Sequence, residues 1–240
     1  MVLIVLPVFN EERVLADNVK KLYQFLKKRL NEPWQIIIAS NGSTDATDPL
    51  AAKLALSLPG VKFFPLKKAG KGYAISETWK TWPADYFIFM DVDLATDLEA
   101  LPALLDALKQ DHAIVYGSRF APCSRVQCPW LRKILSSGYG IVFRFLLGSK
   151  IQDPACGFKG VNAKTVKEIL PAVQSQGWFF DSELILRAEK AGFSLKAIPV
   201  QWSEYRNPGR QSKVPLALIF IYLKEILRLR KSLRGSPFFL

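Results

Sequence analysis

Residues 2–12 read Val-Leu-Ile-Val-Leu-Pro-Val-Phe-Asn-Glu-Glu, an apolar run rich in β-branched residues that gives way to polar ones at Asn10. Such residues favour an extended backbone, so we expect a strand over Val2–Val8. From Asn10 to about Leu30 apolar residues recur at helical spacing, which predicts an amphipathic helix directly after the strand. The chain therefore begins with a strand followed by a helix.

The same unit of strand and helix recurs along the chain. The segment Asn41-Gly42-Ser43-Thr44-Asp45 combines turn residues with a helix cap, and it separates the second strand from the second helix. Repeated units of this length predict an α/β fold with a mostly parallel, Rossmann-like sheet and helices on both of its faces. We expect further strands over Trp34–Ser40, Val61–Leu66, Tyr86–Met90 and Ala113–Gly117, and further helices up to Leu58 and over Lys71–Lys80 and Leu98–Gln110.

In a parallel sheet of this kind, ligands bind beyond the carboxyl ends of the strands. Three polar segments fall there: Phe9–Glu11, Ser40–Asn41 and Asp91–Asp93. If the strand before them continued, Asp91 and Asp93 would point to the same face, because side chains alternate along a strand. Two such carboxylates repel each other unless a cation or a proton lies between them, and hard oxygen ligands favour Mg²⁺ or Mn²⁺. The pattern indicates a site for a metal and a diphosphate; the alternative is an acidic pair that begins a solvated loop.

The amino-acid composition indicates how large a core the chain can form and in which compartment we expect the protein. Its 240 residues, half of them apolar, can bury the core of one domain, or of one domain with an appendage. The apolar start Val2–Val8 is too short for a signal peptide, and the longest other apolar run, Val214–Leu223, is too short to span a membrane. We therefore expect a cytosolic protein. Three cysteines, an odd number in such a chain, argue against a disulfide framework, and the single histidine, His112, is not spaced to complete a zinc site with them.

The formal net charge of +12 attracts phosphates, whether in nucleic acid, nucleotide sugars or anionic lipid head groups. From Arg206 onward the chain has eight Lys or Arg residues and one acidic residue, Glu225. Within this part, Pro215–Leu233 has the pattern of an apolar or amphipathic helix whose later turns are basic. Such a helix either lies on a membrane surface or packs on the domain with a solvated basic face. A second apolar segment, Trp130–Leu147, is likewise either core or an interfacial helix.

Three motifs near the expected strand ends resemble those of the family 2 glycosyltransferases, which have the GT-A fold. Leu6-Pro7-Val8-Phe9-Asn10-Glu11-Glu12 is similar to the opening motif of the family. Ser40–Asp45 resembles its second motif, and Asp91-Val92-Asp93 resembles its D-x-D motif. All three occur in the family's order and spacing, which makes the combination far more specific than any one motif.

Later segments resemble the polyprenyl-phosphate sugar transferases of that family, which include the dolichyl-phosphate β-glucosyltransferases and mannosyltransferases. These segments are Gly117–Phe120, Asp153–Lys159 and Gly177–Leu184. The resemblance covers about residues 2–213. We therefore expect a GT-A glycosyltransferase domain over residues 1–213, followed by a basic amphipathic helix and tail over residues 214–240.

The resemblance also implies a role for each matching residue. Asp91 and Asp93 flank the metal, Mg²⁺ or Mn²⁺, and the diphosphate, and together with Arg119 they form the catalytic set. The implied donor-binding positions are Pro7, Phe9, Glu11, Ala39, Asn41, Asp91, Val92, Asp93, Arg119 and Lys213, and the implied acceptor-phosphate positions are Arg132, Ser136, Arg206 and Arg210.

Two departures from the mannosyltransferase pattern favour UDP-glucose over GDP-mannose as the donor. Asn41 stands where those enzymes commonly have a second acid, and Ala95 stands where they have Gln after the D-x-D motif. A lipid monophosphate is already ionised at neutral pH, so its attack needs no strong base, whereas the leaving diphosphate needs cations. We therefore expect an inverting transfer of a hexose to a polyprenyl monophosphate. The enzyme would lie on the cytoplasmic face of a membrane, with or without an anchoring partner subunit.

Two alternatives remain at this point. A family 2 enzyme with a hydroxyl acceptor would need a general base, for which Asp153, Asp181 and Glu183 are the candidates; otherwise these carboxylates have a supporting role. A non-catalytic module that binds nucleic acid would account for the charge but for none of the motifs, so we expect no nucleic-acid partner.

Overall fold

The computed structural model describes residues 1–204 and 216–234, and within the last helix it describes the side chains of residues 220–233. The strands are β1 (Val2–Val8), β2 (Trp34–Asn41), β3 (Val61–Leu66), β4 (Tyr86–Met90), β5 (Ile114–Ser118), β6 (Arg125–Gln127), β7 (Phe158–Asn162), β8 (Leu195–Pro199) and β9 (Gln201–Ser203). The helices are α1 (Leu15–Arg29), α2 (Thr47–Ser57), α3 (Lys71–Thr81), α4 (Ala100–Lys109), α5 (Trp130–Leu147), α6 (Ala163–Ile169), the 3₁₀ turn η1 (Leu170–Ala172), α7 (Phe180–Lys190) and α8 (Leu216–Arg234).

Every strand expected from the sequence is present within one residue of its expected bounds. The first helix begins later than expected, at Leu15 rather than near Asn10. Asn10 has a left-handed backbone with φ 55°, and the residues after it form a turn before the helix starts. The polar residues after β1 are therefore held in a loop at the strand end.

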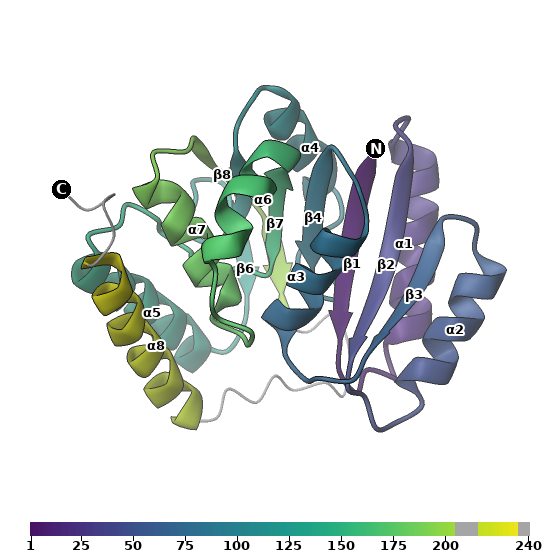
Figure 1. Ribbon diagram of the computed structural model, residues 1–240, viewed down its shortest axis with the longest axis horizontal. Coiled ribbons are helices and arrows are strands. Elements are labelled where there is room, and N and C mark those ends of the chain that lie inside the picture. Colours follow the sequence, from purple (N-terminus) through teal and green to yellow (C-terminus); the bar gives the residue numbers. More distant parts are fainter. Residues whose placement is uncertain (205–215, 235–240) are drawn as a thin grey trace.

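Seven strands form one sheet in the order β3-β2-β1-β4-β7-β5-β8, and β6 pairs with β9 in a separate two-stranded sheet. β1 pairs in parallel with β2 and with β4, whereas β7 runs antiparallel to both of its neighbours. The mostly parallel α/β sheet predicted from the sequence is therefore confirmed. Figure 1 shows helices in front of and behind this sheet.

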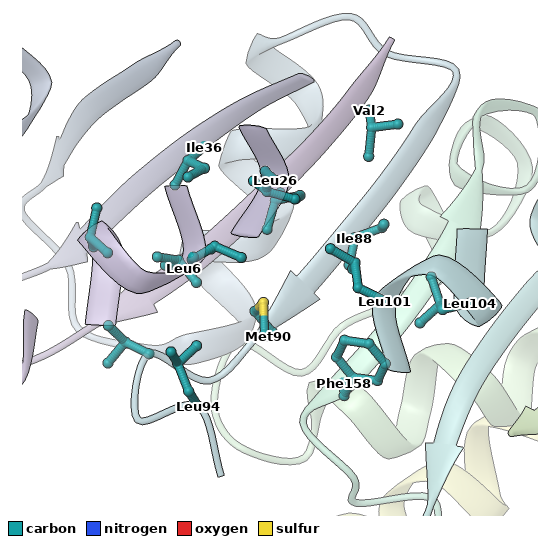
Figure 2. Close-up of a cluster of buried hydrophobic side chains, with 14 of the residues drawn as sticks. Val2, Leu6, Leu26, Ile36, Ile88, Met90, Leu94, Leu101, Leu104 and Phe158 are labelled. Atoms are coloured by element: carbon teal, nitrogen blue, oxygen red, sulfur yellow. The ribbon is translucent and has the colours of Figure 1, made fainter. Parts of the chain in front are cut away.

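The core has two layers, one on each face of the sheet. Alternate side chains of β1 divide between them: Ile4 and Leu6 pack in the layer of α1, α2 and α4, whereas Leu3 and Val5 pack in the layer of α3 and α5–α8. Figure 2 shows side chains of the strands, α1 and α4 gathered in the first layer. Because both faces are covered, the strands are apolar along nearly their whole length.

Helices α5 and α8 lie side by side at one end of the second layer (Figure 1). The rings of Tyr139 on α5 and Tyr222 on α8 lie 4.9 Å apart, and Ile226, Leu229 and Leu233 are buried in the core. The last helix thus packs on the sheet domain through one of its faces. The division expected at residue 213 falls in residues that the structure does not describe, and it stays a prediction.

The opposite faces of the same two helices carry large apolar side chains that are exposed. Trp130, Ile134, Ile141 and Phe145 follow each other on α5 at intervals of four, seven and four residues, which places them in one stripe. On α8 the exposed apolar residues are Phe220, Ile221, Leu223 and Leu227. Among residues 1–204 and 216–234, no helix combines the length and the apolar character needed to cross a membrane.

The packing of α8 predicts different costs for two leucines that are two positions apart. We expect Leu229→Ala, at a site 1% exposed, to lower the free energy of unfolding by about 2–5 kcal/mol, because it leaves a cavity. Leu227→Ala, at a site 56% exposed, is the matched control and should change it by less than about 0.5 kcal/mol. Urea unfolding of both variants tests this, and equal losses would show that α8 does not pack as described.

Candidate active site

The carboxyl ends of β2, β1 and β4 lie side by side, and Asn41 joins two of the segments around them. The Asn41 side chain is buried, its amide nitrogen donates to the Val8 carbonyl oxygen at 2.7 Å, and its amide oxygen accepts from the Gly70 N–H at 3.0 Å. The predicted donor-binding residue Asn41 therefore ties the end of β1 to the start of α3. Its contact with a donor base or ribose stays a prediction.

The loops after β1 and β2 are bonded to each other. Asn10 accepts from the Thr44 N–H at 2.8 Å, and the Glu11 N–H donates to the Thr47 hydroxyl at 2.8 Å. Pro7 and Ala39 are register partners in the two strands, so two of the three predicted donor-site segments meet at this edge. Phe9 is half exposed there.

The D-x-D segment does not continue the strand, so the prediction that an extended backbone places Asp91 and Asp93 on one face is wrong. β4 ends at Met90, and the Leu94 N–H closes a turn by donating to the Asp91 carbonyl oxygen at 3.1 Å. Leu94 itself has a left-handed backbone with φ 51°. Val92, at the middle of the segment, is buried in the core.

The two acidic side chains of this turn have different surroundings. Asp93 accepts from the Ala95 N–H at 3.0 Å and lines a hollow of about 520 Å³ with Lys21 of α1. The Asp91 carboxylate, 39% exposed, pairs instead with Lys71 at the start of α3, 2.9 Å away. The structure therefore places both residues at the strand end but gives each a different neighbour.

Lys71 is a charged residue at the site that belongs to none of the sequence motifs described above. Its ammonium lies 2.9 Å from Asp91 and 2.8 Å from Asp181 on α7, and its side chain is 7% exposed. Burial alone would lower the pKa of Lys71, but the carboxylates of Asp181 and Asp91 outweigh it and raise the pKa above its usual value. The signal in the sequence was a lysine between two glycines, Gly70-Lys71-Gly72, at a helix start.

The Asp91 carboxylate also packs directly against the backbone of Gly157. The Asp91 N–H donates to the Gly157 carbonyl oxygen at 3.2 Å, and a Cβ atom at Gly157 would overlap Asp91 Oδ2. This contact explains the glycine in the Asp153–Lys159 segment.

Arg119, after β5, is held by Asp153. The guanidinium donates to both carboxylate oxygens of Asp153, at 2.9 and 2.7 Å, and the backbone N–H of Arg119 donates to the same group. Asp153 is 1% exposed, so this bidentate pair fixes the arginine in place. The pKa of Arg119 is raised above its usual value, because the negative charge of Asp153 outweighs the effect of burial.

A basic pocket of about 140 Å³ lies beside this arginine. It is lined by Arg119, Lys133, Ser136 and Trp202, among other residues. Arg132, the other described acceptor-phosphate candidate, pairs with Glu204 at 2.6 Å, and its guanidinium lies 5.1 Å from the Trp202 ring centre. The predicted acceptor residues of α5 are thus near each other, whereas Arg206, Arg210 and Lys213 lie outside the described residues.

The three carboxylates considered as general bases are all buried in ion pairs. Asp153 holds Arg119, and Asp181 holds Lys71. Glu183 pairs with Arg187 at 2.8 Å and accepts from the Ser175 N–H at 2.8 Å. These ion pairs fit a supporting role, and a role as general base stays an untested alternative.

Asp91 and Asp93 supply oxygen ligands of the kind that Mg²⁺ and Mn²⁺ take. Among residues 1–204 and 216–234, no group of three or more His, Cys, Asp or Glu side chains could hold a metal ion. Two partly exposed carboxylate groups fit such an ion if phosphate oxygens and water complete its shell, which is how Mg²⁺ is commonly bound. The chemistry of the donor set therefore fits a metal that arrives with a diphosphate.

Comparison with known proteins identifies the family. The sequence model of glycosyl transferase family 2 matches residues 3–170. A polyprenol monophosphomannose synthase of Mycolicibacterium smegmatis is 31% identical over 209 residues, covering 84% of this chain and 77% of the relative. A dolichyl-phosphate β-glucosyltransferase of Dictyostelium discoideum is 29% identical over 242 residues, covering 95% of this chain and 73% of the relative.

A third relative is much longer than this chain. The glycosyltransferase AglD of Haloferax volcanii is 29% identical over 216 residues, which are 89% of this chain but 34% of the relative. The chain thus spans about a third of that protein's length.

A similar solved structure is glucosyl-3-phosphoglycerate synthase of Mycobacterium tuberculosis, crystallised with Mn²⁺, UDP and glucosyl-3-phosphoglycerate. Its TM-score is 0.69 at 16% identity, and the match covers 99% of this chain and 81% of that one. This likeness confirms a GT-A-like fold. The matched family model and the sequence relatives show that the chain belongs to glycosyl transferase family 2 and is an enzyme of that family.

Proposed function

We propose that this enzyme transfers a hexose, with inversion, from a nucleotide sugar to a polyprenyl monophosphate at a membrane surface. The proposal rests on helix α5, which combines residues that line the basic pocket with exposed apolar residues. Its first turns line the basic pocket through Lys133 and Ser136, while Trp130, Ile134 and Phe145 form an exposed apolar stripe on the same helix. A phosphate joined to a long apolar chain is a ligand that uses both features.

The relatives named above support a polyprenyl-phosphate acceptor, because two of them carry dolichyl phosphate or a polyprenol product in their names. For the donor, UDP-glucose is favoured. Asn41 is uncharged and its amide is engaged with Val8 and Gly70, and Ala95 is a buried residue with no oxygen ligand to offer. The named structure that resembles this fold was crystallised with UDP and Mn²⁺.

The reaction can proceed without a general base from this chain. An oxygen of the ionised lipid phosphate attacks the anomeric carbon, and the bond from that carbon to the diphosphate oxygen breaks. The electron pair leaves with the nucleoside diphosphate, so an α-linked donor gives a β-linked product. The buried ion pairs of Asp153, Asp181 and Glu183 are consistent with this, since each carboxylate already has a cationic partner.

The chain's own residues bind and orient the two anions. Asp91 and Asp93 would hold Mg²⁺ or Mn²⁺, which when bound neutralises charge on the leaving diphosphate. Arg119, fixed by Asp153, faces the pocket that it shares with Lys133 and Ser136, where it can donate to the acceptor phosphate. The enzyme would act on the cytoplasmic face of a membrane, alone or with an anchoring partner subunit.

Sugar transfer to a polyprenyl phosphate in detergent tests the proposed reaction. We expect transfer from UDP-glucose rather than GDP-mannose, loss of transfer with a chelator, and a fall in kcat of about 100-fold or more in Asp93→Ala. Product stereochemistry by NMR should show the β linkage. Donor hydrolysis without transfer to the lipid, together with transfer to a sugar hydroxyl, would refute the acceptor assignment.

The contact between Asp91 and Gly157 gives a second prediction. Gly157→Ala should displace the Asp91 carboxylate and lower kcat by about 10–100-fold, while the fold is kept. Gly138→Ala is the control, because a Cβ there meets no atom within 4 Å, and its kcat should be unchanged. Steady-state kinetics with circular dichroism compares the two, and full activity of Gly157→Ala would show that the position of Asp91 is unimportant.

The exposed stripe on α5 predicts binding to anionic vesicles. We expect the double variant Trp130→Ser/Phe145→Ser to bind phosphatidylserine vesicles at least about tenfold more weakly, since each large apolar side chain contributes about 1.5–3 kcal/mol when buried. Leu56→Ser on α2, where Leu56 is 91% exposed, is the matched control and should bind as the parent does. Cosedimentation measures both, and an equal loss in the two would refute a specific membrane face.

A further inference from the structure

Lys71 and Asp181 have no part in the reaction as proposed above. One ammonium lies between two carboxylates from different elements: Asp91, after β4, and Asp181, in the first turn of α7. Lys71 is 8% exposed and Asp181 is 2% exposed. Burying charges in this way is costly unless they are paired, so this group needs an explanation.

Lys71 is not placed to bind a substrate phosphate itself. Its ammonium contacts both carboxylates and lies 5.4 Å from the ring centres of Phe89 and Trp178. A side chain that is 7% exposed presents little of its charge to an incoming diphosphate. By contrast, the Asp91 carboxylate, the other end of the pair, is 39% exposed at the strand end.

The position of the ammonium is fixed by the way α3 meets the loop before α7. The Tyr73 N–H donates to the Gln176 carbonyl oxygen at 2.9 Å, and the Gly72 N–H donates to the Gly177 carbonyl oxygen at 3.2 Å. Gly72 also packs so closely on Phe180 that a Cβ atom there would overlap the Phe180 side chain. The starts of α3 and α7, and with them Lys71 and Asp181, are therefore joined as one unit.

Asp91 is thus confined on two sides. Its Oδ1 accepts from Lys71, and its Oδ2 packs on Gly157. A carboxylate held in this way has one orientation, whereas an exposed carboxylate after a strand would sample several rotamers.

We infer that Lys71 is a positioning residue, anchored by Asp181, that holds Asp91 in the orientation in which it meets the metal and diphosphate of the donor. This inference rests on the proposed function. It assigns Asp181 the task of fixing the lysine and gives Lys71 no direct contact with substrate. Residues that orient a metal ligand from behind typically change metal affinity or activity by 10–100-fold when they are replaced.

A purely structural role makes a different prediction, and a double variant separates the two. If Lys71 only neutralises Asp181, removing both charges in Lys71→Met/Asp181→Asn should restore everything that Lys71→Met alone loses. If Lys71 positions Asp91, the double variant should recover thermal stability but not the binding of metal with nucleotide, because Asp91 still lacks its partner.

The experiment measures Mn²⁺ affinity by electron paramagnetic resonance in the presence of UDP, UDP affinity without metal by calorimetry, and the thermal midpoint. We expect Lys71→Met to weaken Mn²⁺ binding about 10–100-fold and the double variant to stay equally weak at a higher midpoint. UDP affinity without metal should change by less than about twofold. Lys67→Met, at an exposed lysine of the same loop, should match the parent in all three measurements.

Three results would overturn the inference. Recovery of Mn²⁺ affinity in the double variant would show that Lys71 only neutralises Asp181. A large loss of UDP affinity without metal in Lys71→Met would show that Lys71 contacts the phosphates directly. If the parent enzyme binds no Mn²⁺ with UDP, the proposed donor site itself is wrong, and the role of Lys71 is wrong with it; the parent measurement therefore distinguishes the two failures.

Discussion

The parallel pairing of β1 with β2 on one side and β4 on the other determines where the polar groups of this protein lie. Both faces of these strands are buried, so polar residues can follow only at the strand ends. Parallel strands place those ends at one edge. The loops that follow β1 and β2 therefore meet there and are joined by hydrogen bonds, and the turn after β4 lies at the same edge.

The second layer of the core connects this edge to the exposed apolar helices. Tyr139 of α5 donates to the Ser182 hydroxyl, one residue after Asp181, and its ring packs against Tyr222 of α8. Helices α5 and α8 each bury one face in this layer and expose apolar side chains on the other. A surface suited to a lipid is thus attached to the same rigid layer that carries the charges at the strand ends.

The sequence was sufficient for the parts of the fold that depend on local patterns. Apolar runs bounded by turn residues located every strand of the parallel half within one residue, and the three motifs located the site edge. The antiparallel strand β7 was not foreseen, since its insertion between β4 and β5 depends on pairing across about 70 and 40 residues of chain. The D-x-D turn was missed because the alternation argument needed the strand to continue to Asp93, three residues beyond its end at Met90.

Local sequence patterns could not predict the ion pairs at the site either, because the paired residues are far apart in the chain. Lys71 meets Asp181 110 residues away, and Arg119 meets Asp153 34 residues away. These pairs change how the net charge of +12 should be understood. A cation that is held by a buried aspartate adds little to the long-range field, but it is fixed in position, and a fixed charge stabilises a developing charge without having to reorganise. Exposed basic residues such as Lys133 therefore attract anionic substrates over a distance. The paired cations Arg119 and Lys71 instead keep fixed positions at the site.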